Sequence, residues 1–144
     1  MNPISALTGR GAEGIALPAP LDFRALRLPR SPNTCLAAPP GLHPSAHLAA
    51  PALPLDPDAL FARIERAAAA MPRTHLLARW PDRRQAQWVA RTPLMNWPDV
   101  IAAEAVAVGG GASLFLYSRS LFGWSDLGAN RRRVEAWLSA IERE

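Results

Sequence analysis

The chain has 144 residues, 49% of them hydrophobic and 19% charged, a balance that fits one soluble globular domain. All 16 basic residues are arginine, and 12 acidic residues leave a net charge of +4. The absence of lysine excludes Schiff-base and P-loop chemistry. The small positive surplus suits an anionic small molecule or an acidic protein and does not favour a nucleic-acid partner.

Cysteine, histidine and hydropathy patterns exclude several further classes of protein. Cys35 is the single cysteine, so an intramolecular disulfide and a cysteine metal cluster are excluded. The three histidines are scattered without metal-ligand spacing, and we expect no metal and no cofactor. No apolar run is long enough to span a bilayer, and no leader-like segment opens the chain, so we expect a cytoplasmic protein.

Proline dominates the first part of the chain. Residues 1–55 contain 10 of the 15 prolines, which remove backbone donors and block helices. This composition predicts a flexible tail over residues 1–21 and a Pro-rich extended arm over 22–55, which belongs to a single domain of residues 22–144. The segment GRGAEG at 9–14 matches G-x-G-x-x-G but lacks the flanking strand and helix of a dinucleotide site.

The first ordered element is predicted to be a helix. Asp56 is a good N-cap, Pro57 follows at the first helical position, and an apolar stripe runs on until Pro72 ends the helix. Its stripe predicts one buried face.

Four segments of strand character follow this helix. Their connections are too short to hold a crossover helix, so they predict a four-stranded antiparallel meander. The segments are residues 73–80, 85–92, 99–108 and 112–120.

A second amphipathic helix closes the chain. Its apolar positions are Val134, Trp137, Leu138 and Ile141. Because each helix has one apolar stripe to bury, both are expected on one face of the sheet. The predicted fold class is α+β, a two-layer domain in which the meander carries an N-terminal and a C-terminal helix on one face and is preceded by the Pro-rich arm.

Polar and small residues are concentrated between the end of the last predicted strand and the start of the last predicted helix. The helical phase places Arg131 on the side of Val134 and Leu138, so its guanidinium is predicted to point inwards. Hydroxyls, an arginine and a helix N-terminus attract an anion, although the same side chains could simply satisfy one another. The candidate ligand-binding residues are Ser118, Ser120, Ser125, Asp126, Asn130, Arg131 and Arg133.

The run from Ser118 to Arg133 resembles the signature S-x-S-R-x-G-x-S-D-x-G-x-N-R-x-R of a bacterial and plastid family called domain of unknown function 1499. The segment SPNTCLAAPPG resembles its proline-asparagine opening, and PRT followed by RTPLMNWPDVI resembles its middle strands. The likeness covers about residues 22–144. Leu121 stands where the signature has arginine. The resemblance implies the fold and the location of the site and leaves function open, because the family has no established activity.

We therefore expect a non-enzymatic domain that binds an anionic small ligand or an acidic partner at the strand–helix junction 118–133. One alternative is an enzyme acting on a phosphate- or carboxylate-bearing substrate through Ser125 or Asp126, with His75 or Glu104 as base. Another is a protein-interaction module that uses an open face of the sheet.

Overall fold

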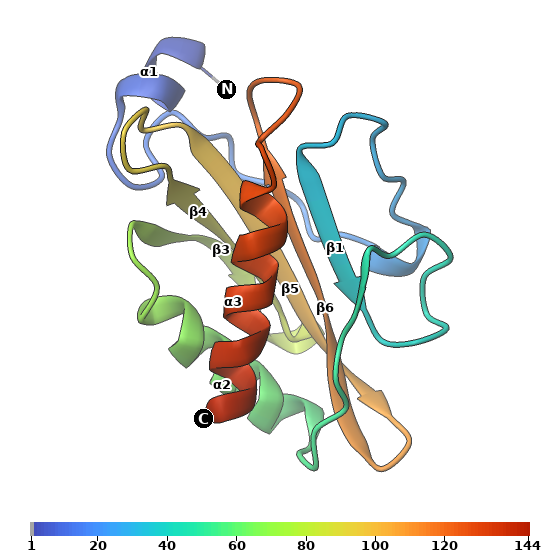
Figure 1. Cartoon of the computed structure of the whole chain (residues 1–144). Helices are drawn as coiled ribbons and strands as arrows, with labels where there is room; N and C mark the ends of the chain where they lie inside the picture. The colour runs from blue at the N-terminus through green and yellow to red at the C-terminus, as the bar shows by residue number, and fades with distance from the viewer. Residues whose placement is uncertain (1) are drawn as a thin grey trace.

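Strand-forming segments in the second half of the chain, with side chains buried on both faces, build the centre of a six-stranded sheet. The computed structural model describes residues 2–144, and the strand order is β2-β1-β6-β5-β4-β3 (Figure 1). Neighbouring strands are antiparallel except β1 and β2, which are parallel. The strands are β1 (Thr34–Ala38), β2 (Leu48–Ala49), β3 (Thr74–Trp80), β4 (Gln85–Arg91), β5 (Pro98–Val108) and β6 (Gly111–Ser120).

The α+β class is confirmed, but the prediction of four antiparallel strands is wrong because the Pro-rich arm supplies two more. Residues 34–38 form a proline-free run whose small and apolar side chains are mostly buried. This run pairs antiparallel with β6, with Thr34 opposite Arg119 and Ala37 opposite Leu116. Averaging the proline content over residues 1–55 hid a short segment that keeps its backbone donors.

Two of the three helices pack on one face of the sheet, as the apolar stripes predict. Helix α2 (Pro57–Ala69) begins where the Asp56 carboxylate accepts the Ala59 N–H at 2.8 Å. Helix α3 (Ala129–Arg143) follows Gly128, which has a φ of 84°. The third helix, α1 (Pro3–Thr8), lies near the N-terminus and is capped by the Asn2 side chain. Across residues 2–144, each helix is too short or too polar to cross a bilayer.

The main core lies between the sheet and these two helices. Ile64 of α2 and Ile141 of α3 are fully buried there. Trp137 of α3 meets Trp88 of β4 edge to face, with 5.3 Å between ring centroids. Helix α3 packs on β1 and β6, and helix α2 packs on β3, β5 and β6.

A second apolar cluster occupies the opposite face of the sheet. Phe23 of the arm stacks on Phe115 of β6, with 5.2 Å between ring centroids. Leu21, Leu26 and Leu28 pack against the same cluster. The arm thus covers the face that the protein-interaction hypothesis required to be open.

The N-terminal segment lies against the end of β4. The buried Arg91 guanidinium donates hydrogen bonds to the carbonyl oxygens of Ala6, Gly11 and Glu13. The Asn96 side chain donates to two further carbonyls of this segment. These contacts lie within residues 1–21, for which the sequence predicts a flexible tail, and that flexibility stays a prediction.

Truncating Phe23 tests whether the arm is an integral part of the fold. Phe23→Ala is expected to lower the free energy of unfolding by about 3 kcal/mol, because a fully buried aromatic ring is replaced by a cavity. Leu17→Ala, at a position 81% exposed in the segment that precedes the arm, is the control and should change it by less than about 0.5 kcal/mol. Urea unfolding measures both, and equal small effects would show that the arm is not part of the folded core.

Candidate functional site

The junction between β6 and α3 is a tight turn built around Asp126. Its carboxylate accepts the backbone N–H of Gly128 at 2.7 Å and that of Asn130 at 3.0 Å. Gly123 and Gly128 have φ values of 82° and 84°, which glycine adopts readily, and Leu127 has a φ of 55°. The acidic side chain thus satisfies free N–H groups at the start of the helix.

Asn130 is the centre of the polar network beneath this turn. Its side chain is fully buried, and its Oδ1 accepts from the Ser118 hydroxyl at 2.6 Å and from an Arg133 guanidinium N–H at 3.0 Å. Its Nδ2 lies 2.8 Å from the Ser120 hydroxyl and 2.6 Å from the Asp126 carboxylate. One amide therefore ties β6, the turn and α3 together.

Asn33, just before β1, is a member of this network that sequence analysis did not assign to the site. Its carbonyl oxygen accepts from Asn130 Nδ2 at 2.9 Å and from the Ser120 N–H at 3.1 Å. Its own Nδ2 donates to the Gly123 carbonyl at 2.7 Å. The proline-asparagine pair in SPNTC was the signal in the sequence, because it forms part of the family resemblance.

An ion pair between Asp99 and Arg133 closes the network on the β5 side. The two side chains are 2.8 Å apart and only 4% and 18% exposed. Burial raises the pKa of Asp99, and the Arg133 cation opposes this rise. Burial also raises the pKa of Asp126, but hydrogen bonds from Asn130 and Gly128 outweigh it and leave that pKa below its ordinary value.

The predicted inward placement of Arg131 is wrong. Its side chain is 54% exposed and only faces Glu135, one helical turn away, at 3.8 Å. The buried stripe of α3 is centred on Asn130, Val134 and Trp137, so Arg133 lies at its edge and turns inwards instead. The error came from counting Leu138, which is only partly buried, as a central member of the stripe.

The remaining candidate, Ser125, also lies outside the network. It is exposed, and its hydroxyl accepts the Leu127 N–H at 3.4 Å within the turn. The structure therefore brings together five of the seven predicted residues, namely Ser118, Ser120, Asp126, Asn130 and Arg133.

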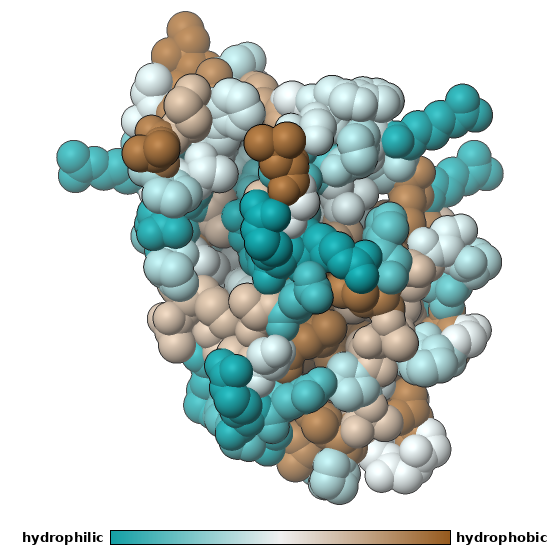
Figure 2. Space-filling view, in the orientation of Figure 1, coloured by the Kyte–Doolittle hydropathy of each residue, from teal (hydrophilic) through white to brown (hydrophobic). Residues whose placement is uncertain are grey.

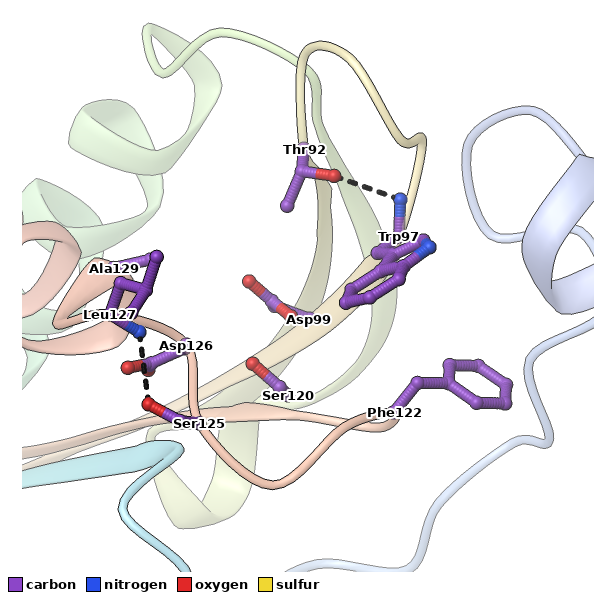
Figure 3. A pocket seen from close by; sticks show the side chains of 9 residues that line it. All are labelled: Thr92, Trp97, Asp99, Ser120, Phe122, Ser125, Asp126, Leu127 and Ala129. Atoms are coloured by element: carbon purple, nitrogen blue, oxygen red, sulfur yellow. Dashed lines mark hydrogen bonds between the residues drawn. The ribbon is translucent and has the colours of Figure 1, made fainter.

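A cavity of about 170 Å³ opens on one side of the junction (Figure 3). Figure 3 shows the Asp99 and Ser120 side chains between the Trp97 ring and the turn that carries Asp126. Two carboxylates line this cavity and no cationic side chain does. Its electrostatics do not suit an anion.

A second groove, of about 280 Å³, lies on the other side of the first turn of α3, and we call it the arginine groove. Four arginines line it, and no acidic residue is among its lining residues. Apolar groups from Met71, Pro72, Pro93, Ala136 and Trp137 contribute much of its wall. The arginines are Arg73, Arg91, Arg132 and Arg133.

Each arginine of the groove has some contact with the protein. Arg91 is bound by backbone carbonyls and Arg133 by Asp99. Arg73 donates through Nε to the Arg91 carbonyl at 3.0 Å, and Arg132 donates through Nη1 to the Leu127 carbonyl at 2.8 Å. Because a guanidinium has five N–H donors, exposed Arg73 and Arg132 each retain donors for a ligand.

The bases considered for an enzyme lie away from the junction. Glu104 is five residues beyond Asp99 on β5, about 17 Å at ~3.4 Å per residue, and its carboxylate accepts from Gln85. His75 is on β3, three strands from β6, at a spacing of roughly 14 Å. Neither residue lines the cavity or the arginine groove.

Comparison with known proteins places the chain in a family. The sequence profile of the family described as "Protein of unknown function (DUF1499)" matches residues 27–141, so the chain belongs to this family and the resemblance is confirmed. A search of curated proteins finds no match. The crystal structure of protein MLL2253 from Mesorhizobium loti is similar, with 11% identity, a TM-score of 0.46, and coverage of 76% of this chain and 97% of that one.

Removing the Asn130 amide tests whether it holds the junction together. Asn130→Ala is expected to lower the free energy of unfolding by about 3 kcal/mol, because it leaves buried partners of the amide unsatisfied. Arg131→Ala, at the adjacent exposed position, should change it by less than about 0.5 kcal/mol. Denaturant unfolding compares the two variants. A larger loss of unfolding free energy for Arg131→Ala than for Asn130→Ala would contradict this assignment and support an inward-pointing Arg131.

The lowered pKa of Asp126 predicts a pH dependence of stability. Its stabilising contribution is present above the ordinary carboxyl pKa of 3.8 and is lost as the pH falls through the lower folded-state value. The stability difference between the wild type and Asp126→Asn should therefore be constant from pH 7 to about pH 5 and shrink below about pH 4. A difference that grows on acidification in urea-unfolding series would contradict this assignment.

Proposed function

We propose that this domain is a binding module for a small phosphate- or carboxylate-bearing ligand, held in the arginine groove beside the strand–helix junction 118–133. The observation that supports the proposal most is the composition of the groove. Four guanidinium groups line it, and among its lining residues there is no carboxylate.

Arg73 and Arg132 are the side chains that suit direct contact with the ligand. Both are exposed, and they come from different elements, the turn before β3 and the first turn of α3. A guanidinium binds a carboxylate or phosphate through two parallel N–H donors, which gives orientation as well as affinity. An anion between them would bridge the two elements.

Arg133 and Arg91 are less exposed than Arg73 and Arg132, and of the two only Arg91 adds positive charge that the Asp99 carboxylate does not neutralise. Arg133 is paired with Asp99, whereas Arg91 is buried among neutral carbonyl oxygens. Burial lowers the pKa of Arg91, and the nearby Glu13 opposes this fall. Since arginines in the first turn of a helix oppose its dipole, a bound anion would also relieve that repulsion.

The walls of the groove indicate the remainder of the ligand. Met71, Pro72 and Pro93 present apolar surface beside the arginines. Binding pockets typically combine such surface with a few polar groups that fix orientation. An anion with a small apolar body suits the groove better than a bare ion, and an acidic side chain of a protein partner is the other occupant with this chemistry.

The groove favours binding over catalysis. Its lining residues include one hydroxyl, that of Thr74, and no histidine or carboxylate that could act as its base. Ser125 and Asp126 face the opposite cavity or form the turn. The nucleophile and base of the enzyme alternative are thus not assembled at the junction.

Calorimetric titration and thermal shift test the proposal with inorganic phosphate, phenyl phosphate, benzoate and a glutamate-rich peptide at constant ionic strength. Arg73→Gln and Arg132→Gln should each weaken binding about tenfold, because each removes a charged hydrogen-bond donor pair. Arg131→Gln, one residue away on the same helix and outside the groove, is the matched control and should bind like the wild type.

Two results would overturn the proposal. One is the absence of saturable stabilisation of the wild type by all four ligands, since a ligand that binds the folded state raises the melting temperature. The other is an equal loss of affinity in Arg131→Gln and Arg132→Gln, which would indicate general attraction to surface charge. If only the peptide binds, the occupant is an acidic partner.

A further inference from the structure

Large apolar side chains are exposed together at one end of the domain. Among residues 2–144, six of the eight large hydrophobic residues that are exposed belong to α1, to the loop after β4 or to the loop after β6. Isolated exposed hydrophobics are ordinary, but three separate segments that each present them at one end are not. We call this set the apolar tip: Ile4, Leu94, Met95, Trp97, Trp124 and Leu127.

Direct contacts hold the three segments side by side. Asn96, in the loop after β4, donates hydrogen bonds of 3.0 Å to the carbonyls of Leu7 in α1 and of Gly9, which follows α1. In the loop after β6, a Cβ at Gly123 would lie 3.7 Å from the Trp97 ring. Figure 1 shows α1 and both loops at the same end, and Figure 2 shows brown side chains projecting there.

The tip is convex. Leu94 is 95% exposed and Leu127 is 86% exposed, so their side chains project from the surface. Leu127 also has a left-handed backbone, which a leucine adopts only under strain, and this places an apolar side chain at the outermost point of the turn. Projecting apolar side chains fit a deformable apolar phase better than the preformed surface of a folded partner.

Positive charge surrounds the tip. Arg132 is joined to the tip through its hydrogen bond to the Leu127 carbonyl. Arg10 follows Gly9, and Arg73 lines the same groove as Pro93, the neighbour of Leu94. Figure 2 shows strongly hydrophilic side chains directly below a projecting brown one. The exposed arginines at this end are Arg10, Arg73, Arg131 and Arg132, against exposed Glu13 and Glu135.

We propose that this end of the domain docks on an anionic bilayer surface, with the apolar tip at the headgroup–acyl boundary and the surrounding arginines among the headgroups. Interfacial binding strengthens with the apolar area inserted and with attraction between basic side chains and anionic lipids. Tryptophan suits this depth because its ring is apolar and its N–H is polar. The inference goes beyond the proposed ligand binding, since Leu94 and Leu127 do not line the arginine groove.

Vesicle co-sedimentation of the full chain tests the docking. We expect binding to vesicles of phosphatidylcholine with 30% phosphatidylglycerol, weaker binding to pure phosphatidylcholine, and release at high salt, because the headgroup attraction is screened. Brominated acyl chains should quench emission from Trp97 and Trp124 at the tip, whereas Trp88 and Trp137 are buried in the core.

A double variant of the tip supplies the control for folding. Leu94→Gln with Leu127→Asn should lower vesicle partitioning at least about tenfold through loss of inserted apolar area. Its stability to urea should not fall, because asparagine accepts the left-handed backbone at 127 better than leucine does. Leu17→Gln is the control, because Leu17 is 81% exposed but does not belong to the apolar tip. Its neighbours in sequence line a pocket over the face of the sheet that α2 and α3 do not cover, so this substitution should leave partitioning unchanged.

Three outcomes would overturn the docking. They are failure of the wild type to bind either vesicle, equal losses in Leu17→Gln and the double variant, and a concentration-dependent dimer in light scattering that the double variant abolishes without any vesicle binding. The last would assign the tip to a second copy of the chain. Phosphate titration of the double variant tests the arginine groove separately, because the two substitutions leave that groove intact. Phosphate binding without vesicle binding would overturn only the membrane docking.

Discussion

The side-chain amide of Asn130 is the interaction on which the rest of the junction depends. It joins Asn33 before β1, the two serines at the end of β6 and Arg133 of α3. In the sequence, Asn33 is 97 residues from Asn130, Ser118 is 12 residues away and Arg133 is 3 residues away. Because a buried polar group is costly unless its partners are in place, these segments have one arrangement that satisfies all of them. The short strand from the Pro-rich arm is therefore fixed at the same point where the closing helix begins.

This constraint also decides where positive charge remains free. The network turns Arg133 inwards and neutralises it with Asp99, while the neighbouring Arg131 and Arg132 stay on the surface. Arg132 and Arg73 both line the arginine groove, whereas Asp99 and Asp126 line the neighbouring cavity. A single turn thus separates a carboxylate-lined cavity from an arginine-lined groove, which is why the anion proposal belongs to the groove.

Residue patterns predicted the local elements well and the connections between distant segments less well. The strands 73–80 and 112–120 and both amphipathic helices follow from alternation and capping, which are local properties. Strand β1 was missed because its pairing with β6 is a tertiary contact that a proline-rich composition conceals. Asn130 and Arg133 were chosen correctly as neighbours of the serines, but the direction of Arg131 depended on where the stripe of α3 is centred. Hydrophobic periodicity does not locate the centre of an apolar stripe to within one residue.

We propose that the junction orders Arg73 and Arg132 around one anion site. A titration of isotopically labelled protein with phenyl phosphate, followed by amide and guanidinium NMR signals at constant ionic strength, tests it most directly. We expect saturable shifts confined to Arg73, Thr74, Arg132, Arg133 and Ala136, with a single affinity. Non-saturating shifts spread over exposed arginines such as Arg24, Arg27 and Arg131, or no shifts at the groove, would contradict it.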